Sequence, residues 1–129
     1  MKNISIMCVD RIPYDKILHY VASIIILIDD RISLFNEDDG TFIGSESDPI
    51  KCVYTPLDQD FSFSLDVYLP ENTSWNGSDL DFCRMFSSKA GSQCAVDTPD
   101  GNPFTWILVN GETSELISID DNYKIKRIK

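Results

Sequence analysis

The segment FSFSLDVYL (61–69) constrains the fold more than any other stretch of the chain. Apolar and polar residues alternate along it, with Phe61, Phe63, Leu65, Val67 and Leu69 on one side and Ser62, Ser64, Asp66 and Tyr68 on the other. Successive side chains of a β-strand point to opposite faces of a sheet, so this alternation predicts a strand. One face of the strand belongs to the core, and the other is exposed to water or covered by another element.

Shorter patterns predict further strands. Runs rich in apolar and β-branched residues, bounded by turn formers, indicate strands at 3–9, 49–55 and 92–97. Residues 104–119 are typical of a hairpin, because Asn110-Gly111 is a strong two-residue turn signal. Near the end of the chain, residues 123–129 alternate cations with isoleucine, which favours a protected edge strand.

The first helix signal comes early in the chain. Pro13 stands at a plausible first helical position and Asp15 follows in the first turn, so a helix is predicted over residues 14–22. The next stretch, 23–35, is rich in β-branched residues and divides around two aspartates, which favours two strands joined by a tight turn. A single helix over 14–28 is the competing interpretation, and the sequence leaves both open.

A second helix is predicted over residues 79–90. Ser78 and Asp81 have the spacing of a capping box, and Gly91 suits a helix end. With 129 residues, the chain has the usual size of one domain and needs no disulfides to bury a core. We therefore expect a single α+β domain over residues 1–129, mainly an antiparallel sheet with about two helices.

The formal net charge of −10 is concentrated between residues 29 and 66. This acidic region holds ten aspartates and glutamates against Arg31 and Lys51. Such a field repels phosphate backbones, since nucleic-acid binding depends on cations that displace counterions. Direct binding of DNA or RNA is therefore not expected, and a basic protein is the natural complement.

Five of these acids lie in the segment NEDDGTFIGSESD (36–48), which contains no lysine, arginine or histidine. They are Glu37, Asp38, Asp39, Glu46 and Asp48. Aligning Gly40 with the obligatory glycine of an EF-hand loop puts Phe35 at the first ligand position, and Phe cannot coordinate calcium. Two interpretations remain for this segment: a solubilising loop, or a docking surface for cations.

The cysteines and the apolar stretches give little sign of a metal, an export signal or a membrane span. Four cysteines occur without a CxxC pair and with a single histidine, which is not a zinc pattern. A Cys83–Cys94 disulfide stays open, but the first residues show no secretory signal, so reduced and mostly buried thiols in the cytoplasm are expected. The most apolar stretch, 17–28, is too short to cross a bilayer.

No catalytic motif is present. The chain lacks a nucleophile elbow, a Walker loop and a His-Glu-x-x-His helix. His19 follows Leu18 on an apolar segment, where a packed ring is expected more often than a general base. Asp58 with Asp60, or Asp66 with another acid, has the residue types for acid–base work, but so acidic a chain produces such pairs by chance. We therefore expect no enzymatic activity and no cofactor.

The polar face of the 61–69 strand has the composition of a protein interface. Asp66 and Tyr68 share that face, and Trp75 follows just beyond the strand. Tyr and Trp bury large areas at low entropic cost, and neighbouring carboxylates pair with an incoming Lys or Arg. In the alternative interpretation, a helix covers this face and places Tyr68 and Trp75 in the core.

The acidic region 29–66, the strand DFSFSLDVYLP (60–70) and the closing segment NPFTWILVNGETSELISID (102–120) give the chain a family likeness. As a small, acidic α+β domain without catalytic motifs, it resembles the immunity proteins of bacterial toxin systems, including those of contact-dependent growth inhibition. No fixed motif defines that class, so no binding position is carried over. The resemblance implies a cytoplasmic inhibitor that binds the C-terminal domain of a cognate toxin and covers its active site.

Toxins of this kind are frequently nucleases, whose substrate surfaces are basic because they hold phosphates. We expect acidic side chains to occupy or flank such a surface, with Tyr68 or Trp75 as a buried anchor. The predicted partner-binding residues are Glu37, Asp38, Asp39, Glu46, Asp48, Asp58, Asp60, Asp66, Tyr68 and Trp75. Two other functions stay open: a self-associating structural or adaptor subunit, of phage origin for example, and a small hydrolase. The oligomeric state is also open.

Overall fold

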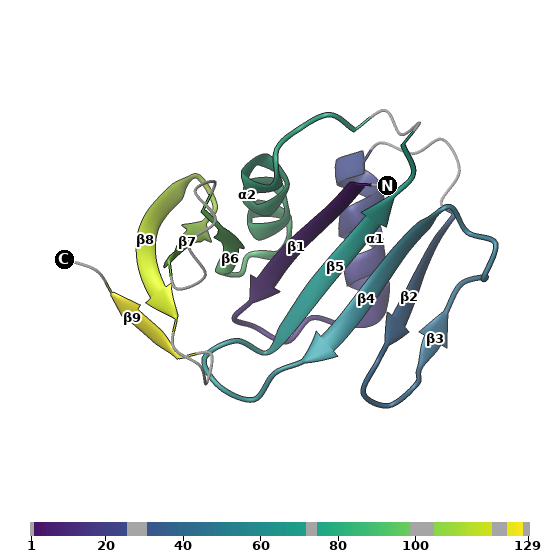
Figure 1. Ribbon diagram of the computed structural model, residues 1–129, viewed down its shortest axis with the longest axis horizontal. Helices are drawn as coiled ribbons and strands as arrows, with labels where there is room; N and C mark the ends of the chain where they lie inside the picture. Colours follow the sequence, from purple (N-terminus) through teal and green to yellow (C-terminus); the bar gives the residue numbers. More distant parts are fainter. Residues whose placement is uncertain (1, 26–30, 72–74, 99–104, 120–123, 128–129) are drawn as a thin grey trace.

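A computed structural model describes residues 2–25, 31–71, 75–98, 105–119 and 124–127. Within these ranges, nine strands form one sheet in the order β3-β2-β4-β5-β1-β6-β7-β8-β9 (Figure 1). The strands are β1 (Lys2–Cys8), β2 (Ile32–Asn36), β3 (Phe42–Ile43), β4 (Ile50–Pro56), β5 (Phe63–Leu69), β6 (Cys94–Asp97), β7 (Thr105–Asn110), β8 (Thr113–Ile119) and β9 (Ile125–Arg127). Neighbouring strands are antiparallel, except that β2 and β4 are parallel.

Two helices, α1 (Tyr14–Ile25) and α2 (Asp79–Ala90), lie on the same face of the sheet (Figure 1). Their apolar side chains and those of the strands they cover form the main hydrophobic core. The predicted fold class, an α+β domain with a mainly antiparallel sheet and two helices, is confirmed in the described part of the chain.

The alternating segment provides a central strand, β5, which pairs with β1 on one side and β4 on the other. The side chains of Phe63, Leu65, Val67 and Leu69 are fully buried beneath the helices, while the intervening residues are half-buried. The prediction of one core face is therefore confirmed for these four residues, but it is wrong for Phe61, which precedes the strand and belongs to a second hydrophobic cluster. Neither helix covers the opposite face of this strand, so the interpretation that placed Tyr68 under a helix is wrong.

Helix α1 begins at Tyr14, as in the predicted range 14–22, and Pro13, the candidate for the first helical position, lies just before it. The carbonyl of Pro13 accepts hydrogen bonds from the N–H groups of Lys16 (3.1 Å) and Ile17 (3.0 Å), so Pro13 precedes the first helical residue. The helix then continues to Ile25, and the strand interpretation is wrong for residues 23–25. Residues 26–30, which include the two aspartates of the expected turn, lie outside the described residues. The second expected strand is present as β2.

Burial explains why α1 overrides the β propensity of its isoleucines. Ile17, Val21, Ile24 and Ile25 are the buried residues of the helix, and their spacing places them on one side of it. Packing this stripe against the sheet outweighs the weak intrinsic preference of β-branched residues for strands. Tertiary packing, not local propensity, decides this segment.

Helix α2 has the predicted capping box. The Ser78 hydroxyl accepts a hydrogen bond from the Asp81 N–H, and the Asp81 carboxylate accepts one from the Ser78 N–H, each over 3.1 Å. Gly91 ends the helix at φ +63°, a left-handed conformation that glycine adopts without strain. The bounds of this helix and its cap are therefore confirmed.

The last strands of the sheet curl over its other face (Figure 1). They enclose a second, smaller hydrophobic cluster, formed by Met7, Phe61, Ala95, Leu108, Ile117 and Ile119. The predicted hairpin is present as β7 and β8, but its turn is shifted by one residue, because Asn110 pairs with Thr113 and leaves Gly111 and Glu112 as the loop. The edge strand appears as β9, which pairs with β8 at one end of the sheet.

Candidate functional site

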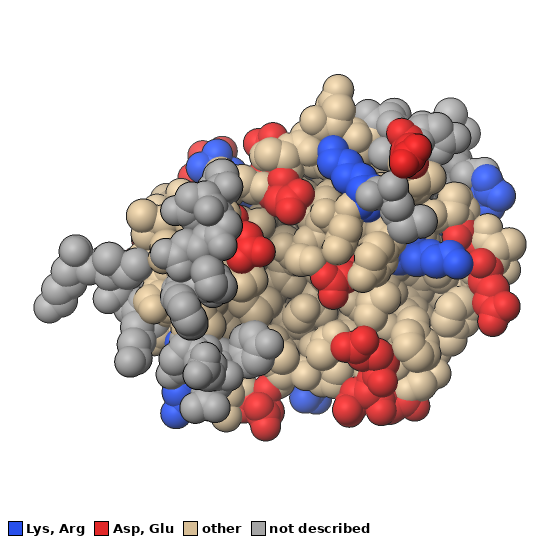
Figure 2. Space-filling model, viewed as in Figure 1, with Lys and Arg blue, Asp and Glu red and all other residues tan. Residues whose placement is uncertain are grey.

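The part of the sheet formed by β1, β5, β4 and β2 has one face without a helix, which we call the open face. Pairing between these strands and β3 aligns one row of residues across it: Phe42, Phe35, Val53, Asp66 and Ser5. Figure 2 shows that the middle of this face is mostly uncharged, and that acidic side chains gather over the turn that joins β2 to β3. The turn is therefore the most acidic part of the open face in this view.

The acidic segment 36–48 is divided by β3 and does not form one loop. Glu37, Asp38 and Asp39 lie in the turn between β2 and β3, which we call the acidic turn. Glu46 and Asp48 follow β3 and lie in the connection to β4, beyond the other end of the short strand. The two groups of carboxylates that the sequence places in a single surface are thus separate.

Hydrogen bonds within the acidic turn hold its backbone in place. The Asn36 side-chain oxygen accepts hydrogen bonds from the N–H groups of Asp38 (2.9 Å) and Asp39 (3.4 Å). The Thr41 N–H donates to the Asp39 carboxylate over 2.9 Å, and such bonds lower the pKa of Asp39. These contacts give the turn a defined shape and favour the charged form of Asp39.

The carboxylates of the acidic turn contact neutral groups of the described chain. Glu37 accepts a hydrogen bond from the Thr55 hydroxyl over 2.6 Å, so a neutral group orients it. Among the residues that the structure describes, no lysine or arginine lies within ion-pairing distance of Glu37, Asp38 or Asp39. The described lysines and arginines therefore leave the negative charge of this turn unpaired.

Two aromatic residues beside the acidic turn were missed by the sequence analysis. Phe35 and Phe42 lie directly opposite each other in the β2–β3 pair, and their side chains are 40% and 44% exposed. Ile43, also in β3, is exposed as well. Alternation along β2 could have identified Phe35, because the fully buried Leu34 next to it must point to the helices.

The structure places Tyr68 and Trp75, the two predicted interface anchors, in different parts of the protein. Asp66 and Tyr68 are half-buried on the open face, where the Ser5 hydroxyl donates to the Asp66 carboxylate. Trp75 instead packs against the main core, with its ring centroid 6.2 Å from that of Phe82 of α2. Trp75 and Tyr68 therefore do not lie on one surface.

The two remaining acids of the predicted set lie in the connection between β4 and β5. Asp58 is exposed there. The Asp60 carboxylate accepts a hydrogen bond from the Ile125 N–H over 2.7 Å and so holds β9 in place. Asp60 therefore has a structural contact that the sequence did not indicate.

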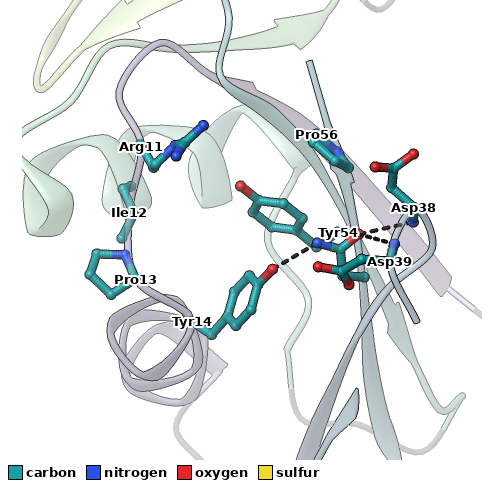
Figure 3. Close-up of a pocket in the computed structure, with 9 residues that line it drawn as sticks. Arg11, Ile12, Pro13, Tyr14, Asp38, Asp39, Tyr54 and Pro56 are labelled. Atoms are coloured by element: carbon teal, nitrogen blue, oxygen red, sulfur yellow. Dashed lines mark hydrogen bonds between the residues drawn. The ribbon is translucent and has the colours of Figure 1, made fainter. Parts of the chain in front are cut away.

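A pocket of about 720 Å³ opens on the helix side of the acidic turn (Figure 3). It is lined by Arg11, Ile12, Pro13, Tyr14, Asn36, Asp38, Asp39, Tyr54 and Pro56. The walls come from the start of α1, the ends of β2 and β4, and the acidic turn. Of the predicted partner-binding residues, only Asp38 and Asp39 line it.

A second hollow, of about 380 Å³, lies on the open face where the sheet begins to curl. Asp66, Asp97 and Trp106 are among the residues that line it. Burial raises the pKa of Asp97, which is the environment expected of a general acid but also of any partly buried carboxylate. Within the described ranges, no group of three or more His, Cys, Asp or Glu residues could hold a metal ion.

His19 lies at the surface, whereas the four cysteines are buried. His19 is exposed, so the expectation of a packed ring is wrong; it lies away from the stripe that buries Ile17 and Val21. All four cysteines are buried free thiols, as expected. Cys8 and Cys94 are opposite each other in the pairing of β1 with β6, and their sulfur atoms lie 3.2 Å apart.

Comparison with known proteins finds no match among protein-family models, curated proteins or solved structures. Among the described helices, none combines the length and apolar character needed to cross a membrane.

Proposed function

We propose that this protein is an immunity protein, which binds a basic bacterial toxin domain and covers its active site. One observation carries the proposal: the unneutralised carboxylates of the acidic turn stand next to the exposed rings of Phe35 and Phe42. Both features favour a protein interface, because apolar contacts and charge pairs act at different stages of binding.

In this proposal, charge sets the rate at which the partner associates, and aromatic contacts set the rate at which it dissociates. The chain as a whole carries a net charge of −10, so a basic partner is attracted before contact, and the association rate rises. Burial of Phe35 and Phe42 against that partner then slows dissociation, since large buried aromatic side chains dominate interface energies. Asp66 and Tyr68 extend the same face toward the middle of the sheet.

The proposed partner is the C-terminal domain of a nuclease toxin. A nuclease holds its substrate by phosphate contacts, so its active-site surface is rich in lysine and arginine. Carboxylates at a rigid turn can occupy that surface in place of phosphates. The proposed site of action is the cytoplasm, where such an inhibitor protects the cell that makes the toxin.

A capture experiment tests this function. The tagged protein is expressed in its native host, washed at low and then high salt, and the retained chains are identified by mass spectrometry. We expect one basic protein in equal amount, whose toxicity is abolished when the two are co-expressed. Recovery of the tagged chain alone would count against the proposal.

A second function, a self-associating structural subunit, is supported by one feature of the sheet. The edge strand β3 has only two residues and exposes Phe42 and Ile43, so an apolar edge is open to another chain. Self-association of this kind would persist at high salt, because apolar and backbone contacts are little screened. Sedimentation at several concentrations, in low and high salt, distinguishes it from a monomeric inhibitor.

A further inference from the structure

The pocket beside the acidic turn contains a polar group without a partner. Tyr54 is only 6% exposed, yet its hydroxyl makes no hydrogen bond with any described residue. Figure 3 shows this hydroxyl pointing across the pocket toward the side that carries Arg11. The ring of Tyr54 is buried, but its hydroxyl oxygen reaches the open space of the pocket (Figure 3), where it is available to a hydrogen-bonding ligand.

The aromatic walls of the pocket are fixed before any ligand arrives. The Tyr54 ring stacks on Phe63 at a centroid distance of 4.8 Å, and the Tyr14 ring meets it edge-on at 5.1 Å. Tyr14 is held in turn by the Asn36 side chain, which donates to its hydroxyl over 2.7 Å. Binding therefore requires little reordering of these rings, which reduces its entropic cost.

The charges around the pocket favour a cation over an anion. Asp38 and Asp39 lie on the side of the acidic turn, and Arg11 lies on the opposite side. Two carboxylates outnumber one guanidinium, and the hydrogen bonds from Thr41 lower the pKa of Asp39 and keep it charged. Arg11 is exposed, so it can turn toward water when another cation enters.

We infer that this pocket receives an arginine side chain of the partner, an inference that rests on the proposed function. A guanidinium is planar, carries five N–H donors and packs well against aromatic rings. The pocket offers it carboxylate oxygens and two tyrosine hydroxyls. A lysine would find the charge but would lose the bidentate contacts.

Replacing Arg11 tests the inference, because a cationic ligand and an anionic ligand predict opposite changes in affinity. It carries the same charge as the inferred ligand, so it opposes binding of a cation. Replacing Arg11 with glutamine should strengthen binding of an arginine side chain by about two- to fivefold, the range of a partly exposed charge interaction. If the pocket served an anion, the same change would weaken binding.

The experiment uses the full chain, labelled with ¹⁵N, and follows backbone NMR signals during titration with N-acetyl-arginine amide. N-acetyl-citrulline amide is the matched probe, because it has nearly the same shape without the charge. We expect saturable shifts at residues that line the pocket with the arginine probe only. Tyr54→Phe and Asp39→Asn should each weaken binding by about two- to fivefold, whereas Glu46→Gln, on the far side of β3, should leave it unchanged.

Three results would overturn the inference: equal shifts with both probes, shifts spread evenly over all acidic segments, or weaker binding after Arg11→Gln. Asp39→Asn guards against a folding defect in the Tyr54 variant, since Asp39 is exposed. If the arginine probe misses the pocket but a basic partner is still captured, the inference fails and the proposed function stands. If the probe fills the pocket but no partner is captured, the proposed function fails and the guanidinium site stands.

Discussion

The side-chain amide of Asn36 donates a hydrogen bond to the Tyr14 hydroxyl over 2.7 Å, which ties the end of β2 to the start of α1. The oxygen of the same amide accepts from the N–H groups of Asp38 and Asp39. Asn36 is only 4% exposed. One buried side chain therefore fixes both the acidic turn and a wall of the adjacent pocket.

Replacing Asn36 with alanine should lower the free energy of unfolding by about 1–3 kcal/mol, because its hydrogen-bonding partners lose their contacts. It should also weaken binding of the captured partner, since the acidic turn loses its internal support. Tyr14→Phe is the matched control: it removes only the link to α1 and leaves the bonds to Asp38 and Asp39. Urea unfolding and partner titration compare the two. Equal losses of partner affinity in both variants would show that the turn does not depend on Asn36.

Reversing the charge of the acidic turn should slow association with the partner. In the variant Asp38→Lys/Asp39→Lys, two attractive carboxylates become repulsive, so the association rate constant should fall and its dependence on salt should flatten. The control is Glu46→Lys/Asp48→Lys, which changes the net charge equally beyond the other end of β3. Stopped-flow kinetics at several salt concentrations measure both. The same slowing in both variants would assign the effect to overall charge and not to the turn.

The exposed pair Phe35 and Phe42 should affect the rate at which the partner dissociates, not the rate at which it associates. Phe35→Ser/Phe42→Ser removes apolar area that lies at the surface, so the partner should dissociate faster, by about tenfold or more if the pair forms a central contact. The control is Leu116→Ser in β8, where the side chain is 52% exposed. Surface plasmon resonance gives both dissociation rates. A dissociation rate in the aromatic variant no faster than in the Leu116 variant would place the interface elsewhere.

Much of the fold was predictable because its signals are local. The alternation in 61–69 determines the core face of β5, and the capping box of Ser78 with Asp81 locates the start of α2. Residues 23–25 were ambiguous, because their β-branched side chains fit a strand or a buried helix equally well. Only packing against the sheet, which no short window of sequence contains, places them in α1.

The candidate site was less predictable, because it joins distant parts of the chain. The sequence identified Asp38 and Asp39 as partner-binding candidates, but their pocket also needs Arg11 and Tyr14 from the start of α1 and Tyr54 from β4. It also treated 36–48 as one acidic loop, since two residues are enough for β3 but too few for a recognisable strand pattern. Contacts between distant segments depend on strand order, which local patterns do not specify.

Stability at alkaline pH should depend on Cys52, whose burial raises the pKa of its thiol to about 12. In the unfolded chain a thiol titrates near pH 8.5, at roughly its ordinary pKa. The unfolded state therefore loses this proton first, and the free energy of unfolding falls as pH rises above about 8.5, by up to about 1.4 kcal/mol per pH unit. Below that pH, the thiol is protonated in both states and its titration has no effect.

Cys52→Ala should reduce the slope with which the free energy of unfolding falls as pH rises, because one titrating thiol has been removed. The variant will start from a lower stability at pH 7.5, by about 1 kcal/mol or more, because it removes a buried sulfur atom. The informative quantity is therefore the slope: urea unfolding between pH 7.5 and about pH 10 should give curves that converge. The neighbouring Cys94 thiol and then burial raise the pKa of Cys83, and the Cys8 thiol and then burial raise that of Cys94, so a residual decline is expected in the variant. Parallel curves would mean that the Cys52 thiol ionises equally easily in both states, and hence that water reaches it in the folded protein.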